Sequence, residues 1–114
     1  MAEDVTITIS GWSQQGQGVT IQCGRRLSGT MLVTNNTSRD LTATASEVRI
    51  SMIADNGPVQ RFTRRLPSRI PIPIAFDIDV PPGVVAGIAT FTAFVYLSDS
   101  RQIVANFPVT IKCP

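Results

Sequence analysis

The side chains that carry out most protein chemistry are scarce in this sequence. None of the 114 residues is histidine, which removes the commonest general base and the commonest zinc ligand. The two cysteines, Cys23 and Cys113, stand 90 positions apart, a separation that fits neither a zinc knuckle nor a redox CxxC motif. We therefore expect no catalytic activity, no bound metal and no cofactor.

Asp77 and Asp79 are the carboxylates whose spacing invites a chemical interpretation. Two positions apart on a strand, they would share one face at a separation of about 6 to 7 Å. A glycosidase holds its carboxylates across a cleft, however, and a calcium site draws more oxygen ligands from a loop. Ion pairing with nearby arginines is the expected use of both carboxylates.

Four arginines, Arg61, Arg64, Arg65 and Arg69, lie within nine residues. On a strand, Arg61 and Arg65 would face one way and Arg64 the other, so they form no single stripe. Only Phe62 supplies an aromatic ring close to them, and we do not expect nucleic acid as the partner. Charges that protect a solvated edge hairpin from further pairing account for this cluster, and an anionic partner surface is the alternative.

The elements that must position these residues are strands. Hydrophobic residues make up 43% of the chain and charged residues 16%, which favours one folded domain over residues 1–114. Alternating apolar residues predict strands near positions 5–9, 19–23, 27–34, 41–53, 59–66, 70–80, 88–97 and 103–113. No window shows a capped apolar stripe of helical period, and no apolar run approaches the roughly 18 residues that a membrane span needs. Seven to eight strands predict an all-β fold, an antiparallel β-sandwich of immunoglobulin-like architecture, with a closed barrel or jelly roll as the competitor.

The composition of two predicted strands indicates where each of them lies in its sheet. Segment 70–80 alternates six apolar residues with an opposite face that includes Pro71 and Pro73. Because proline donates no ladder hydrogen bond, this strand should lie at an edge, with its apolar face entirely in the core. Segment 88–97 is apolar on both faces, which predicts a central strand.

Two other segments carry local irregularities. The apolar phase of segment 41–53 changes near Ser46 and Glu47, which predicts a β-bulge or a switch between sheets at that point. Asn35 and Asn36 each begin a formal glycosylation sequon, although the same residues are equally an ordinary turn sequence.

Both cysteines fall in the inward phase of their predicted strands. A disulfide between Cys23 and Cys113 would close a loop of about 90 residues and stabilise the fold by roughly 4 to 5 kcal/mol in the chain-entropy model. The alternative is two buried free thiols acting as small hydrophobic residues. Two in-phase cysteines near strand ends are typical of an exported domain.

The first residues, Met1–Val5, show neither the basic nor the apolar region of a signal peptide. We expect either a mature exported domain that follows an added initiator methionine, or the native start of a protein assembled without export, such as a virion component. The cysteines favour the first history, because cytosolic thiols are kept reduced.

Two stretches resemble bacterial extracellular immunoglobulin-like modules of the cell-adhesion-related type. Residues Gly29–Ser38 (GTMLVTNNTS) are similar to the strand and turn G-x-φ-x-V-x-N-x-S/T of these modules. Residues Phe76–Gly83 (FDIDVPPG) and then Gly87–Phe91 (GIATF) are similar to their F-x-φ-x-φ-P strand and the G-x-φ-x-F strand that follows. The resemblance covers residues 19–111 and implies a β-sandwich without catalytic residues. The chain differs from these modules in standing alone rather than in a tandem array, which leaves open a free-standing assembly or decoration protein.

These features predict a non-catalytic interaction or adhesion module that is secreted, periplasmic or on a cell surface. Its partner would be another protein, other copies of itself included, or a glycan. The expected contact surface consists of Trp12, Gln14, Gln15 and Gln17 in a loop rich in glycine and glutamine, together with Arg61, Arg64, Arg65 and Arg69. The alternative is a structural protein of a virion or filament, in which an edge strand or an N-terminal arm joins neighbouring copies by strand addition.

Overall fold

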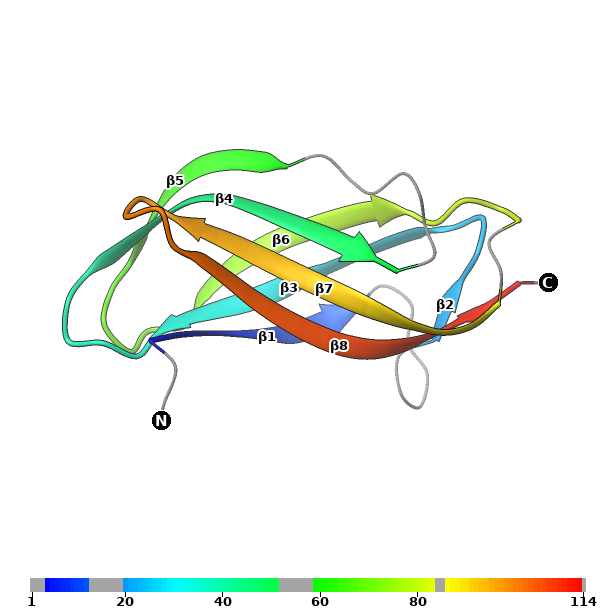
Figure 1. Ribbon diagram of the computed structural model, residues 1–114, viewed down its shortest axis with the longest axis horizontal. Helices are drawn as coiled ribbons and strands as arrows, with labels where there is room; N and C mark the ends of the chain where they lie inside the picture. The colour runs from blue at the N-terminus through cyan, green and yellow to red at the C-terminus, as the bar shows by residue number, and fades with distance from the viewer. Residues whose placement is uncertain (1–3, 13–19, 52–58, 84–85, 114) are drawn as a thin grey trace.

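The computed structural model describes residues 4–12, 20–51, 59–83 and 86–113. Their regular structure is eight strands, β1 (Val5–Trp12), β2 (Thr20–Gln22), β3 (Arg26–Asn35), β4 (Leu41–Ile50), β5 (Gln60–Leu66), β6 (Ile72–Asp79), β7 (Gly87–Leu97) and β8 (Gln102–Lys112). They form a three-stranded sheet in the order β1-β3-β6 and a five-stranded sheet in the order β2-β8-β7-β4-β5. The two sheets lie over each other, as Figure 1 shows. The predicted all-β sandwich is confirmed, and its two separate sheets exclude the closed barrel. The described residues include no helix long and apolar enough to cross a membrane.

The core lies between the two sheets and is centred on β7. This strand is the middle one of its sheet, as predicted, and Phe91 on its inner face is fully buried. The Phe91 ring lies 5.2 Å from the ring of Phe76 on β6 and 6.3 Å from the ring of Phe107 on β8. Since β6 belongs to the other sheet, these aromatic contacts help to hold the two layers together.

β2 departs from the predicted antiparallel arrangement. It runs parallel to β8, with Thr20 opposite Thr110 and Gln22 opposite Lys112, whereas the other ladders between the described strands are antiparallel. The chain leaves β1 in one sheet, adds β2 to the other and returns to the first for β3. The direction of β2 follows from this crossing and not from its own three residues, which alternate as they would in either kind of ladder.

β6 lies at the edge of the three-stranded sheet, as its prolines predict. The Val80 amide donates to the Arg25 carbonyl at 3.0 Å, so the main chain of Val80 faces β3. Main-chain groups of successive strand residues point to opposite sides. Alternate residues from Pro73 to Asp79 therefore turn their main-chain groups towards the open edge, where the missing amide of Pro73 interrupts no ladder hydrogen bond.

The apolar face of segment 70–80 is only partly in the core. Ile74 and Phe76 are buried, whereas Ile72 is half-buried and Ile70 is 52% exposed. The prediction that all six apolar residues face the core was therefore wrong at the start of the segment. Ile70 precedes β6, at the point where the chain crosses from β5 of the other sheet.

The phase change predicted within β4 is a break in register. β4 shifts against both β5 and β7 between Ala43 and Ala45, slightly earlier than the expected position at Ser46. After the shift, Val48 and Ile50 are buried while Arg49 is exposed. The irregularity thus moves the inward face of β4 from odd to even positions, which is what a bulge does to an alternating pattern.

Candidate interaction site

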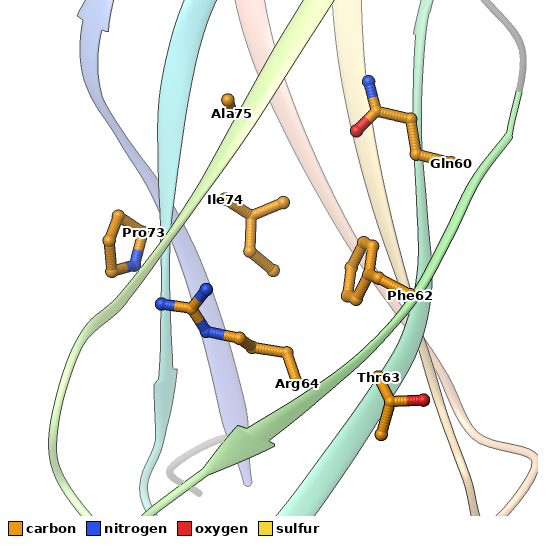
Figure 2. A pocket seen from close by; sticks show the side chains of 7 residues that line it. All are labelled: Gln60, Phe62, Thr63, Arg64, Pro73, Ile74 and Ala75. Atoms are coloured by element: carbon orange, nitrogen blue, oxygen red, sulfur yellow. The ribbon is translucent and has the colours of Figure 1, made fainter.

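The sandwich is open along one side, where the edge strands β5 and β6 of the two sheets face each other. β6 packs against β4, so the inner face of β5, the outermost strand of the larger sheet, is only partly covered. A groove of about 270 Å³ lies between β5 and β6. Its lining residues are Gln60, Phe62, Thr63 and Arg64 from β5 and Pro73, Ile74 and Ala75 from β6 (Figure 2).

The floor of the groove is apolar and one rim is cationic. Ile74 is buried and Phe62 is half-buried, whereas Arg64 and Gln60 are exposed. Figure 2 shows the Arg64 side chain reaching from β5 towards Pro73 on β6. An inward-facing charge of this kind discourages indiscriminate pairing at a sheet edge. Arg64 also selects what can bind in the groove, because a partner that covers its guanidinium must supply a hydrogen-bonding group.

The main chain of β5 also presents an open edge. The Thr42 carbonyl accepts a hydrogen bond from the Ser98 amide at 2.9 Å, so the main chain of Thr42 faces β7 and that of Ala43 faces β5. Ala43 lies opposite Arg64. Arg64 therefore directs its amide and carbonyl towards β4, and β5 has no second neighbour among the described strands. Among the described strands, both walls of the groove are thus the outermost strands of their sheets.

The arginines around the groove are mostly not neutralised. Arg61, Arg64 and Arg69 are exposed, and none of them forms an ion pair with a carboxylate in the part of the chain that the structure describes. Arg65 pairs with Asp40. Of the four arginines singled out from the sequence, only Arg64 lines the groove, which agrees with the predicted division of their side chains between two faces.

The carboxylates of β6 belong to a different ion-pair cluster. Arg26 Nε lies 2.5 Å from Asp77 Oδ1 and 3.7 Å from Asp79 Oδ1. The expected pairing with arginine is therefore present, although the partner comes from β3 and not from the arginine cluster of β5. Hydrogen bonding to Asp77, followed by the charges of Asp77 and Asp79, raises the pKa of Arg26.

Asn35 anchors the ends of β5 and of the segment that leads to β6. Its side chain is fully buried, and Nδ2 donates to the Leu66 carbonyl at 2.8 Å and to the Arg39 carbonyl at 2.6 Å. Oδ1 accepts from the Thr37 amide at 2.9 Å and from its hydroxyl at 2.6 Å. The Asn35 carbonyl accepts from the Arg69 amide at 2.7 Å. The first sequon is thus a structural turn whose asparagine is inaccessible in the folded protein.

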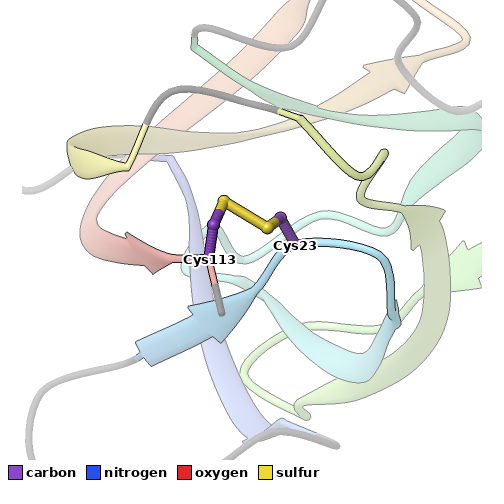
Figure 3. Close-up of a disulfide and its surroundings, with 2 residues drawn as sticks. All are labelled: Cys23 and Cys113. Atoms are coloured by element: carbon purple, nitrogen blue, oxygen red, sulfur yellow. A yellow bond between two sulfur atoms is a disulfide. The ribbon is translucent and has the colours of Figure 1, made fainter.

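The disulfide lies where β2 and β8 end side by side. Cys23 and Cys113 are joined, with their Cα atoms 5.2 Å apart (Figure 3), and the Cys23 amide donates to the Lys112 carbonyl at 3.0 Å. Cys23 is buried and Cys113 is half-buried. The bond ties the short edge strand β2 to the C-terminal strand β8. The disulfide is the one predicted from the sequence.

The outer face of the five-stranded sheet carries a second cluster of polar side chains. Tyr96 Oη donates to Glu47 Oε1 at 2.9 Å, and Arg49 Nε donates to Glu47 Oε2 at 2.8 Å. The Arg49 guanidinium also lies 5.2 Å above the Phe94 ring. Burial raises the pKa of Tyr96, and the hydrogen-bonded Glu47 carboxylate raises it further. This cluster satisfies its own charges, which suits a structural role.

The glutamine-rich loop proposed as a contact surface lies mostly outside the described residues. Gln14, Gln15 and Gln17 are among the residues not described. Trp12 belongs to β1, whereas a loop was expected from position 10. A register shift between Ile9 and Gly11 allows β1 to continue along β3 to Trp12, and a strand interrupted in this way loses the alternation that marks it in the sequence.

Comparison with known proteins identifies the fold. No family model and no curated protein matches the sequence. Solved structures of similar fold include the CARDB domain of the PF1109 protein from Pyrococcus furiosus, solved in complex with di-metal ions (17% identity, TM-score 0.61, 96% of this chain and 88% of that one); the N-terminal domain of PorA (12%, 0.57, 95% and 97%); and the SrpA adhesin from Streptococcus sanguinis (11%, 0.54, 96% and 57%). The described residues of this chain contain no group of three or more cysteine or acidic side chains that could hold a metal. At these identities the likeness concerns the fold alone, and it shows that the chain is an immunoglobulin-like β-sandwich.

Proposed function

We propose that this protein is a non-catalytic interaction module of an exported or cell-surface protein, and that it contacts a partner protein through the groove between β5 and β6. The observation that carries this proposal is the open side of the sandwich. Two strand edges face each other there across an apolar floor, and Arg64, which has no ion-pair partner among the described residues, lines the groove between them. Such edges are ready templates for another chain.

The chemistry of the groove supports binding rather than catalysis. Its polar side chains are those of Gln60, Thr63 and Arg64. A hydroxyl group needs a neighbouring general base to act as a nucleophile, and no such base lines the groove among the described residues. The surface therefore offers recognition by shape, main-chain hydrogen bonds and charge.

Export is supported by the disulfide. Bonds of this kind persist in oxidising compartments and are rare where glutathione and thioredoxin keep thiols reduced. The similarity in fold to the SrpA adhesin is in keeping with a role outside the cytoplasm. We propose the cell surface, the periplasm or the external medium as the location.

Photo-crosslinking in the native cells tests the proposed function. A benzophenone amino acid in place of Gln60, an exposed residue of the groove, should form adducts with another protein. The same group in place of Ile88, which is 81% exposed on β7, serves as the control and should form none. Absence of adducts from position 60, or equal adducts from both positions, would contradict the proposal.

The alternative, a structural protein of a virion or filament, has one observation in its favour. The three-stranded sheet ends in two outer strands, β1 and β6. Pairing of β1 in one copy with β6 in the next would be a heterologous contact, which propagates into rings or filaments. Light scattering on the gently extracted native protein distinguishes the two functions, because the alternative predicts particles of many copies and a free interaction module predicts none.

A further inference from the structure

We propose that the groove binds an extended segment of the partner, which adds to β6 as a fourth strand of the smaller sheet and places an acidic side chain against Arg64. This inference rests on the proposed function and specifies the chemistry of the partner. It commits to a peptide strand in which an acidic residue stands two positions from a large apolar one.

The main chain of β6 determines where the added strand can pair. Ala75, Asp77 and Asp79 turn both an amide and a carbonyl towards the open edge, whereas Pro73 can offer only its carbonyl. Regular pairing is therefore possible from Ala75 onwards. The prolines before it limit the length of the ladder, which distinguishes this edge from one that would pair with any strand.

Among the described residues, the smaller sheet has no strand beyond β6 to cover the inner face of β5. Neighbouring strands lie about 4.8 Å apart and packed sheets about 10 Å apart. A strand added beside β6 would extend the three-stranded layer over β5. Every second side chain of that strand would then point down towards Phe62 and Ile74, and contact with this apolar floor calls for a large apolar residue.

Arg64 sets the charge of the next inward position. Positions two residues apart on the added strand are separated by roughly 7 Å along it. Arg64 lines the groove together with Phe62 and Ile74, and covering an exposed guanidinium without a counter-charge would be costly. An acidic residue on the added strand removes that cost and gives a charge-assisted hydrogen bond.

A second copy of this chain does not supply the required pattern from its described outer strands. In β6, Asp77 and Asp79 alternate with Phe76 and Ile78 and so occupy the opposite face. β1, β2 and β5 contain no acidic residue within their bounds. Nucleic acid fits less well than a peptide, because the single aromatic ring of the groove, that of Phe62, is half-buried in its floor.

Selection from a displayed library of random ten-residue peptides tests the pattern directly. The unmodified protein should enrich peptides with an acidic residue two positions from a large apolar one. Arg64→Glu should bind those peptides about a hundredfold more weakly and should enrich basic residues in place of the acid. Arg61→Glu is the matched control, since it makes the same charge change on the same strand outside the groove, and it should change affinity less than about threefold.

A proline substitution tests whether the edge of β6 is used. Ala75→Pro removes an outward-facing amide of β6 and should weaken the selected peptides at least about tenfold. Circular dichroism and thermal unfolding establish that each variant is folded, and if Ala75→Pro does not fold, the comparison of Arg64→Glu with Arg61→Glu decides.

Several results would overturn strand addition. They are a failure to enrich any peptide, enrichment without the acidic position, equal weakening by Arg64→Glu and Arg61→Glu, and unchanged binding in a folded Ala75→Pro variant. Tighter binding of single-stranded DNA than of the peptides, or dimerisation that blocks the groove, would equally exclude it. Crosslinks from position 60 to a protein partner, together with any of these results, would leave the proposed function standing while strand addition fails.

Discussion

Replacing Asn35 by alanine should lower the free energy of unfolding by about 3 to 5 kcal/mol. The fully buried side chain makes four hydrogen bonds, two donated to main-chain carbonyls and two accepted from Thr37. Each such bond contributes about 1 kcal/mol, and a buried acceptor left without a donor adds a desolvation penalty of about 1 to 3 kcal/mol. The loss is a large fraction of the free energy of unfolding of a small domain, which is about 5 to 15 kcal/mol.

Urea unfolding with the disulfide intact, followed by circular dichroism, measures this loss. Asn36→Ala is the control, because the Asn36 side chain is exposed. Substitutions of exposed residues usually change stability by less than about 0.5 kcal/mol. Since Asn35 also binds the carbonyl at the end of β5, Asn35→Ala should weaken peptide binding in the groove. A loss below about 1 kcal/mol, or an equal loss in both variants, would refute the role assigned to Asn35.

Three further predictions follow from the core, the disulfide and the polar outer face. Phe76→Ala should destabilise the fold by about 3 to 5 kcal/mol in the same unfolding assay, because a nearly fully buried ring is replaced by a cavity. Alkylation of the native protein without reductant should leave its intact mass unchanged, whereas two alkylated cysteines would show that Cys23 and Cys113 are not bonded. Tyrosinate absorbance reports Tyr96 alone, because the chain has one tyrosine; its midpoint should lie above 10.0 in the folded protein and move towards that value in Glu47→Gln. Because folding raises the pKa of Tyr96, the contribution of this residue to the stability of the fold is fully present below about pH 10 and is lost as the pH rises further. A titration midpoint at or below 10.0 would contradict this prediction.

The arrangement of the core could be predicted from local alternation. Period-two patterns place Phe91 and Phe76 on inner faces, and the prolines before Ala75 predict that β6 lies at an edge. The same reasoning could not give the direction of β2, since alternation is identical in parallel and antiparallel ladders. It also extended the core as far as Ile70, because periodicity does not reveal where the covering sheet ends.

The candidate site could be predicted only in part. Alternation alone separates Arg64 from Arg61 and Arg65, because side chains on a strand change face at every residue. What Arg64 faces depends on β6 being the neighbour of β5 across the sandwich and on the smaller sheet ending one strand short. Those are properties of topology, and no local pattern around Phe62 contains them.

Hydrogen exchange at the outward-facing amides gives the most direct test of the groove as a strand-binding site. In the complex with a selected peptide, the amides of Ala75 and Asp77 should exchange more slowly by at least about tenfold, because strand addition converts them from edge groups to ladder donors. The amide of Thr63, on the opposite edge, should exchange at its original rate. Protection of Thr63 with no change at Ala75 and Asp77, or unchanged exchange at all three amides, would contradict the account.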